Sequence, residues 1–538
     1  MQFASNQTPD KLRGGYYTPL ALADFLLAWG LGCEPQQILE PSCGDGAFLD
    51  ALARRAPAGT PHIQAMELLP AEADKARVTL ERYLAAGGTG EVIQGDYLRH
   101  AIDDDSTYDL VLGNPPYVRY QYLGAPTIQA AQALLTRWGL PLPRHASSWA
   151  PFVVDGASRL RPGGRLAMVV PAELLQVGYT APLRQWLAGL GLVRIIRFRT
   201  LVFPEVQQEV VLLLLERGER RGVRVLELDS LRALAELDAE GIACVAPEAL
   251  PKGAKWTGYA LEPQALAAAR KAFEHPEVHS FDQLAEVCVG VVTGANRFFC
   301  VDDATVSAHG LEPAVLPMFG RSAEATGLRF TAEDHAANRR AGRRAWLLDL
   351  PSRPREQLPA PWQRYLAAGE AEDLPSRYKC RVREPWWAVP SIHAAPVALF
   401  KRCHATTRLI LNEAWAHTTD TVYRVTPRQG VEPRDLVLSF LNSLTMLSVE
   451  LCGRSYGGGV LELIPSEIRR LRVPVVTASD GAFAEMDGLL RAGAAPETVL
   501  DAGDRWVLER GLGMDSALIA DLRGAWLALM QRRLGRRG

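Results

Sequence analysis

The tetrad Asn114-Pro115-Pro116-Tyr117 follows directly on an apolar run at residues 108–113. The run predicts a buried strand, and the prolines predict a rigid loop because each fixes φ and removes a backbone donor. The Asn114 side-chain oxygen and the Pro115 carbonyl could each accept one hydrogen of a planar amino group, while the Tyr117 ring offers a stacking face. Two such acceptors would localise the nitrogen lone pair towards an incoming methyl group. The tetrad therefore predicts a methyl-acceptor site for an exocyclic aromatic amine.

A second candidate site lies upstream, at residues 38–49. An apolar strand there runs into a turn that contains Gly44 and Gly46, and a helix is expected to begin near Ala47. Glycine lets a backbone approach a ligand closely, although many strand-to-helix turns use it only for tight geometry. The turn is therefore informative only together with the strands that follow it.

The next predicted strands end in polar side chains. The strand near residues 62–66 ends in Glu67, the strand at 91–94 is followed by Asp96, and the fourth strand carries Asn114. The carboxyl ends of parallel strands meet at one sheet edge, which is where doubly wound α/β folds bind ligands. The series predicts this fold, with Glu67 placed to accept both ribose hydroxyls of a cofactor.

The glycine spacing narrows the class of cofactor. The sequence has no Gly-x-x-x-x-Gly-Lys-Ser/Thr motif, which excludes a P-loop, and it lacks the third glycine of the dinucleotide fingerprint. S-adenosylmethionine therefore fits better than NAD. Before the first strand, residues 20–29 predict a helix with Thr18 as N-cap and Pro19 at its first position, and a helix N-terminus can receive a cofactor carboxylate.

Taken in order, the element at residues 14–19, the glycine turn, the tetrad and the long C-terminal region resemble one enzyme class. This class is the gamma class of DNA adenine-N6 methyltransferases, in particular the TaqI-like and Eco57I-like branch of type II restriction-modification methylases. The resemblance implies a Rossmann-like catalytic domain that uses S-adenosylmethionine, followed by an α+β target-recognition domain. It assigns the cofactor site to Tyr17, Thr18, Glu40, Pro41, Cys43, Gly44, Asp45, Gly46, Glu67, Leu68, Asp96, Tyr97 and Asn114.

Within that site, the resemblance gives each segment a role. Residues 40–46 cradle the methionine part of the cofactor, and Asp96 receives the adenine amino group with Leu68 and Tyr97 beside the ring. Asn114, Pro115 and Tyr117 are the implied catalytic residues, and they also bind the substrate base. Phe203 is the implied aromatic that stacks on the opposite face of the extruded base. The long segment at 118–147 could close over the flipped base or over the strand left behind.

The predicted domain order is a catalytic domain at 1–225, a linker at 226–255, a target-recognition domain at 256–475 and a helical segment at 476–538. The net charge of −2 is unevenly distributed, because residues 321–410 contain sixteen Lys/Arg against nine Asp/Glu. A basic, aromatic-bearing stretch in a nearly neutral chain is expected of a domain that lies on a phosphate backbone. Three stretches, at 290–299, 378–387 and 454–463, resemble parts of TaqI-like specificity domains. Trp386 and Trp387 could pack as a rigid wall beneath the basic residues.

Cysteine spacing and apolar stretches argue against a metal site, a disulfide framework and a membrane protein. The eight cysteines show no Cys-x-x-Cys or paired Cys/His spacing, so we expect reduced thiols and no metal site. No apolar stretch of about 18 residues is present and the N-terminus lacks a secretory pattern, so no membrane and a cytoplasmic location are expected. No nuclease constellation is evident. Any cleavage is expected to belong to a separate restriction endonuclease.

The sequence favours one function and leaves three alternatives. The favoured function is that of a site-specific methyltransferase that flips an adenine out of double-stranded DNA and methylates its N6. The alternatives are a DNA cytosine-N4 methyltransferase, a protein glutamine methyltransferase with the same tetrad, and a catalytically inactive DNA-binding subunit of a defence system. The tetrad with Asn in this motif order favours adenine, the basic C-terminal region disfavours a protein substrate, and the filled catalytic positions disfavour an inactive subunit.

Overall fold

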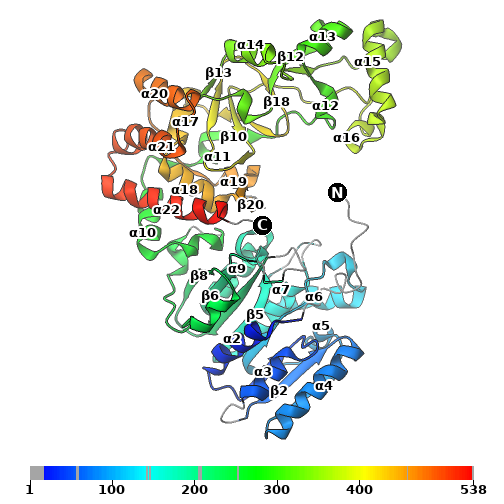
Figure 1. Cartoon of the computed structure of the whole chain (residues 1–538), viewed down its shortest axis with the longest axis vertical. Helices are drawn as coiled ribbons and strands as arrows, with labels where there is room; N and C mark the ends of the chain where they lie inside the picture. The colour runs from blue at the N-terminus through cyan, green and yellow to red at the C-terminus, as the bar shows by residue number, and fades with distance from the viewer. Residues whose placement is uncertain are drawn as a thin grey trace. The chain divides into compact units, whose positions relative to one another are not determined.

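The structure, a computed structural model, describes residues 17–55, 60–140, 143, 147–200, 202–203, 209–250, 254–456 and 459–535. The chain divides into two compact units, Met1–Pro263 and Gln264–Gly538. Unit 1 contains the glycine turn and the tetrad, and unit 2 contains the basic stretch (Figure 1).

Unit 1 is built on one sheet with the strand order β3-β2-β1-β4-β5-β7-β6-β8. β7 runs antiparallel to β5 and β6, and the other neighbouring strands pair in parallel. This confirms the predicted doubly wound α/β fold. The strands are β1 (Gln37–Glu40), β2 (His62–Glu67), β3 (Thr89–Gln94), β4 (Tyr108–Gly113), β5 (Leu160–Pro171), β6 (Gly191–Phe198), β7 (Val210–Arg217) and β8 (Gly222–Leu228).

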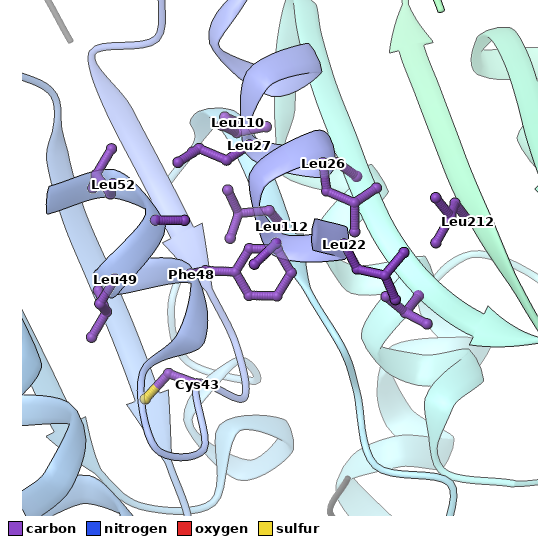
Figure 2. Packing of buried hydrophobic residues seen from close by; sticks show 14 of the residues in the cluster. Leu22, Leu26, Leu27, Cys43, Phe48, Leu49, Leu52, Leu110, Leu112 and Leu212 are labelled. Carbon is purple, nitrogen blue, oxygen red and sulfur yellow. The ribbon is translucent and has the colours of Figure 1, made fainter. Parts of the chain in front are cut away.

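Helices cover both faces of this sheet. Leu110 and Leu112 of β4 point into the core beneath α2 and α3, whereas Val111 lies against Gly156 of α7 on the opposite face. Both faces of the sheet are therefore buried, which explains why the central strands are continuous apolar runs in the sequence. Figure 2 shows part of the first core, where Leu22 of α2 and Phe48 of α3 gather with Leu112. The helices are α2 (Leu20–Leu31), α3 (Ala47–Arg55), α4 (Pro70–Ala85), α5 (Tyr97–His100), α6 (Ala125–Arg137), α7 (Trp149–Ser158), α8 (Glu173–Gln176) and α9 (Ala181–Leu190).

The catalytic unit extends beyond the predicted boundary at residue 225. β8 continues to Leu228 as a strand of the sheet, and Leu234 and Ala239 belong to the core of unit 1. Glu240 pairs with Arg165 of β5 at 2.6 Å. Residues 226–250 therefore pack as part of unit 1 instead of forming a free linker, because their apolar side chains are buried against the α2 face of the sheet.

Unit 2 mixes sheets and helices, as expected for an α+β domain. Its strands form sheets in the orders β10-β19-β15-β17-β13, β11-β14-β12-β18, β16-β21-β20 and β22-β9. They are β9 (Val278–Ser280), β10 (Ala285–Cys288), β11 (Cys300–Val301), β12 (Val315–Phe319), β13 (Arg329–Phe330), β14 (Trp346–Leu348), β15 (Val397–Phe400), β16 (Arg402–Cys403), β17 (Leu409–Asn412), β18 (His417–Thr418), β19 (Val422–Pro427), β20 (Arg454–Tyr456), β21 (Val460–Glu462) and β22 (Arg472–Pro474).

The predicted helical segment at 476–538 is part of this second unit. In α22, Arg533 forms a buried ion pair of 2.6 Å with Glu450 of α18, which attaches the last helix to the unit. Arg536 and Arg537 of the predicted basic tail lie outside the described residues. The helices are α10 (Pro263–Phe273), α11 (Phe281–Leu284), α12 (Asn296–Phe299), α13 (Asp303–His309), α14 (Ala332–Arg340), α15 (Ala360–Ala371), α16 (Tyr378–Arg381), α17 (Pro433–Phe440), α18 (Ser443–Cys452), α19 (Pro465–Ile468), α20 (Asp480–Arg491), α21 (Pro496–Gly503) and α22 (Ser516–Leu534).

The described residues contain no group of three or more His, Cys, Asp or Glu side chains placed to hold a metal ion. No single helix among them is long and apolar enough to cross a membrane, although α17 and α18 together meet that length and composition across a bend of 79°.

Candidate active site

The glycine turn after β1 presents open backbone. Gly44 has φ +54° and Gly46 has φ +94°, a region that glycine enters without strain. A Cβ built on Gly44 would meet nothing within 4 Å, so a ligand can approach the backbone there. A Cβ on Gly46 would lie 3.3 Å from the Ala76 Cα, which shows that this glycine lets α4 pack closely against the turn. The two glycines thus have different tasks.

Glu40, at the end of β1, is a buried carboxyl group to which no described residue donates a hydrogen bond. It is 0% exposed, and neither of its oxygens has a hydrogen-bond partner within the described part of the chain. Burial raises the pKa of Glu40 to about 8, with smaller contributions from the negative charges of Glu67 and Asp45. A buried polar group of this kind is costly unless a ligand satisfies it. The ammonium group of a methionine moiety has the charge and the donors that this carboxyl group lacks.

Glu67 lies against the glycine turn. One of its oxygens accepts the Gly44 backbone N–H at 3.0 Å, and the other accepts the Leu69 N–H at 2.9 Å. These bonds orient the carboxylate at the carboxyl edge of the sheet, as expected for a ribose acceptor. The neighbouring Leu68 is an exposed apolar side chain, which suits its predicted place beside a flat ring.

The Asp96 carboxylate is held by two donors. Its Oδ1 accepts the Leu98 N–H at 3.1 Å, which makes Asp96 the N-cap of α5, and its Oδ2 accepts the Thr127 hydroxyl at 2.5 Å. Thr127 lies in α6, in the long segment after the tetrad. Nothing in the sequence pointed to this residue, because the contact joins positions 31 residues apart.

Tyr97 does not lie where we predicted. Its hydroxyl donates to the Asp155 carboxylate, and its ring stacks on Phe152 with centroids 5.3 Å apart. Burial, followed by the Asp155 charge, raises the pKa of Tyr97 well above its usual value. The side chain turns into the core beneath α7, so the prediction that this ring lies beside the cofactor adenine is corrected. Asp96 is the N-cap of α5 and has extended backbone, whereas Tyr97 is the first residue of the helix.

The approach to α2 also differs from the prediction. The N-cap is Pro19 and not Thr18, and no side chain caps the helix. The Thr18 hydroxyl instead accepts a hydrogen bond of 3.3 Å from the Asn114 amide nitrogen. Tyr17 is exposed, and its hydroxyl donates to Glu72 at 3.4 Å. Residues 14–16 lie outside the described residues.

The tetrad at the end of β4 is held by side chains from several elements. The Tyr117 hydroxyl lies 2.7 Å from the Asn114 Oδ1 and 3.1 Å from the Val169 carbonyl, and it can donate to either. Ser42 of the glycine turn donates to the Asn114 carbonyl at 3.3 Å, and Ser148 donates to the Pro116 carbonyl. In the described part of the chain, no hydrogen bond reaches the Pro115 carbonyl.

These contacts define what the loop can do chemically. Thr18 and Tyr117 determine which way the Asn114 amide points, so its oxygen is available as an oriented acceptor. The Pro115 carbonyl is a second acceptor with free capacity. Ser42, which the sequence did not single out, ties the glycine turn of β1 directly to the tetrad of β4. The predicted cofactor turn and the predicted methyl-acceptor loop therefore lie side by side.

The remaining predicted residues are buried or partly buried. Cys43 is buried, and burial raises the pKa of its thiol, so it offers no thiolate nucleophile. Pro41 is buried and packs near Gly113, and Asp45 is partly buried, with its pKa raised by burial. Phe203 is also buried and belongs to the core of unit 1, so its ring is not openly presented for stacking in this structure.

Comparison with known proteins gives matches over both units. The model of the C-terminal domain of the type II methyltransferase M.Eco57I matches residues 253–508, and the model of the Eco57I restriction-modification methylase matches residues 80–203. The type II methyltransferase M.XamI of Xanthomonas campestris pv. amaranthicola is 24% identical over 473 residues, covering 86% of this chain and 85% of the relative. M.PaeR7I of Pseudomonas aeruginosa is 24% identical over 534 residues, covering 86% of each.

Among solved structures, the type IIG restriction endonuclease BpuSI matches with 13% identity and a TM-score of 0.43. The match covers 97% of this chain and 66% of that one.

Proposed function

Because the chain belongs to the Eco57I-like family of type II restriction-modification methylases, we propose that it methylates the N6 of an adenine in double-stranded DNA. S-adenosylmethionine is the cofactor, and when bound it supplies a methyl group activated on a sulfonium. Specificity for adenine, extrusion of the base and the residue roles are the proposed part of this assignment.

The carboxyl edge of the sheet holds groups that match each part of the cofactor. Glu40 is the proposed partner of the ammonium group, since its buried carboxyl group has no other partner among the described residues. Glu67 is the proposed acceptor for the ribose hydroxyls, and Asp96 for the adenine amino group. Leu68 is proposed to lie beside the adenine ring. Tyr97 has no direct part in this site.

The observation that carries the assignment is the pair of acceptors in the tetrad. Asn114 presents an amide oxygen whose direction is set by Tyr117 and Thr18, and Pro115 presents a carbonyl to which no described residue donates. Together they can accept both hydrogens of an exocyclic amine and stabilise the positive charge that develops on its nitrogen. The Tyr117 ring is proposed to stack on the base. Positioning then supplies most of the remaining rate enhancement.

A base within the duplex cannot reach these acceptors. Its amino group lies inside the stack, so the target nucleotide has to be extruded into the site. Catalysis in this proposal needs no covalent intermediate with the protein and no metal. Both hydrogen-bond acceptors are already oriented in the structure, and the buried Cys43 takes no part.

The order of motifs and the Asn of the tetrad support adenine over cytosine. A protein glutamine substrate is disfavoured because the match to the M.Eco57I C-terminal domain covers most of unit 2. An inactive subunit is disfavoured because Glu40, Glu67, Asp96 and Asn114 are all present and gathered at one sheet edge. In the proposed restriction-modification context, cleavage belongs to a separate restriction endonuclease.

The test is transfer of a tritiated methyl group from S-adenosylmethionine to unmethylated genomic DNA, followed by mass identification of the labelled nucleoside. N6-methyladenine is expected. N4-methylcytosine would retain the mechanism but change the base. Labelled protein or no label, with the cofactor bound, would overturn the DNA assignment in favour of the glutamine or inactive-subunit alternative.

A further inference from the structure

Many surface arginines of unit 2 are paired with carboxylates. Arg329 pairs with Glu413 at 2.6 Å and Arg339 pairs with Asp303 at 3.0 Å. Further pairs of this kind join Arg340 to Glu333, Arg355 to Glu370, Arg402 to Glu462, Arg491 to Asp334 and Arg505 to Glu485. Such pairs contribute little to stability, but they neutralise the cation and leave it a poor partner for an external anion.

The segment at 377–383 differs from this pattern. Arg377, Lys379 and Arg381 are exposed, and the described residues form no ion pair with any of the three. No acidic residue occurs between positions 374 and 383. The three cations therefore form a local positive surface that no carboxylate of the described residues neutralises through an ion pair.

The same segment exposes two large apolar side chains. Tyr378 is 65% exposed and Val382 is 63% exposed; Tyr378 is the first residue of the short helix α16 and Val382 is its C-cap, four residues later. The Lys379 ammonium lies 5.5 Å from the Tyr378 ring centroid. An aromatic ring among unpaired cations suits a partner that is both anionic and rich in flat or apolar groups.

The backbone beneath these side chains is firmly held. Cys380 is fully buried in the core cluster that also contains Trp387, and Arg383 donates to the carbonyls of Val292 at 2.6 Å and Thr293 at 2.8 Å. Two of the family-like stretches, at 290–299 and 378–387, are thus joined by one guanidinium group. Of the two tryptophans predicted to pack beneath the basic residues, Trp387 is buried in this cluster and Trp386 packs against it, partly buried.

The loop at 290–299, which Arg383 links to α16, adds another cation to this surface. Gly294 has φ +80°, and a Cβ there would lie 2.7 Å from the Lys379 Cβ, so only glycine allows this loop to lie against α16. Arg297, three residues later, is exposed, and its backbone carbonyl accepts a hydrogen bond of 3.2 Å from Arg344. We define Arg297, Arg377, Tyr378, Lys379, Arg381 and Val382 as the α16 surface.

We propose that the α16 surface contacts duplex DNA. Arg377, Lys379 and Arg381 lie on phosphates, and the Tyr378 ring contacts bases or sugars. Charge complementarity favours duplex DNA as the partner. The three cations, which form no ion pair within the described residues, sit on a firmly held backbone, and the DNA phosphates form a polyanion of fixed geometry. The inference rests on the proposed function and identifies the side chains through which the chain holds its substrate.

The experiment compares full-length variants for binding to a labelled DNA fragment that the wild type methylates. Arg377→Gln/Lys379→Gln/Arg381→Gln is the test variant, and Lys271→Gln/Arg469→Gln/Arg470→Gln, which removes three other exposed cations of unit 2, is the matched control. Loss of three phosphate contacts lowers the magnitude of the slope of log K against log salt by about 2.7. The control is expected to change the slope by less than one.

Tyr378 is tested separately. Tyr378→Ala is expected to weaken binding about tenfold without changing the salt slope, and Tyr378→Phe is expected to bind as the wild type does, since the ring makes the contact. These substitutions are at exposed side chains, so the melting temperature and the affinity for S-adenosylmethionine are expected to stay unchanged. If the wild type binds and methylates DNA and the α16 variants show the same salt slope and affinity, the proposal for the α16 surface is overturned but the proposed function is not. A wild type that binds S-adenosylmethionine but neither binds nor methylates DNA would overturn the proposed function itself.

Discussion

The Tyr117 hydroxyl lies 2.7 Å from the Asn114 amide oxygen and within donating distance of it. Thr18 accepts a bond from the amide nitrogen on the other side of the same group, so the amide cannot turn without losing both contacts. Through its hydroxyl, Tyr117 orients the Asn114 amide, and through its ring it is proposed to stack on the base.

Replacing Asn114 by Ala removes one of the two proposed amine acceptors. We expect methyl transfer to fall by roughly 10²- to 10³-fold, because loss of one oriented electrostatic contact to a transition state has that size. The cofactor affinity, measured by calorimetry, is expected to change little. Turnover at the wild-type rate would exclude Asn114 from the chemistry.

Two substitutions separate the tasks of Tyr117. Tyr117→Phe keeps the ring but removes the hydroxyl that orients Asn114, so we expect kcat to fall about tenfold, as for one lost hydrogen bond. Tyr117→Ala removes the stacking face as well and is expected to weaken binding of a duplex with a mismatched target base. Single-turnover rates and DNA affinities distinguish the two effects. Equal losses in both variants would contradict a separate role for the ring.

Glu40 predicts a pH dependence of stability. The pKa of Glu40 is raised to about 8, so between its ordinary pKa and pH 8 the folded chain binds more protons than the unfolded chain. Stability contributed by the protonated group is therefore present at low pH and is lost as the pH rises through that window, by roughly 5 kcal/mol at most.

The measurement is the melting temperature of the cofactor-free chain between about pH 5.5 and 8.5, because this range lies mostly within the window in which Glu40 loses its proton. Glu40→Gln is the control and should show a flatter profile, because its amide does not titrate. S-adenosylmethionine should stabilise the wild type increasingly as the pH rises, because its ammonium group favours the ionised carboxylate. The same pH profile in both variants would exclude Glu40 as the source.

Thr127 is expected to act on the cofactor through Asp96. Thr127→Val removes the hydroxyl that donates to the Asp96 Oδ2 at 2.5 Å but keeps the shape of the side chain. We expect the affinity for S-adenosylmethionine to fall about tenfold, the usual size for a hydrogen bond to a charged group. Thr127→Ser should restore most of the affinity. If Val and Ser variants bind the cofactor alike, Thr127 has only a packing role.

Tyr97→Phe tests whether Tyr97 belongs to the core beneath α7 and not to the cofactor site. The variant keeps the ring against Phe152 but removes one donor to the buried Asp155 carboxylate, so we expect the free energy of unfolding to fall by about 1–3 kcal/mol. The affinity for S-adenosylmethionine should stay the same when measured well below the melting temperature. A weaker affinity with unchanged stability would return Tyr97 to the cofactor site.

The sequence by itself determined the first four strands of unit 1 along the chain, together with the glycine turn after β1 and the proline loop after β4. These features are local, because apolar runs form strands, glycines allow positive φ, and prolines stiffen a loop wherever they occur. The gathering of Glu40, Glu67, Asp96 and Asn114 at one sheet edge follows from parallel pairing, so it too could be inferred before the structure was known.

Only the tertiary structure decided which way side chains turn and which distant residues meet. Tyr97 faces the core because it donates to Asp155 and stacks on Phe152, both of α7. Asp96 accepts a hydrogen bond from Thr127 of α6, a helix in the segment that the sequence predicted only as a long connection. The unit continues past residue 225 because Leu234 and Ala239 are buried in its core. Burial and contacts between distant segments depend on the packed chain as a whole, and no local pattern encodes them.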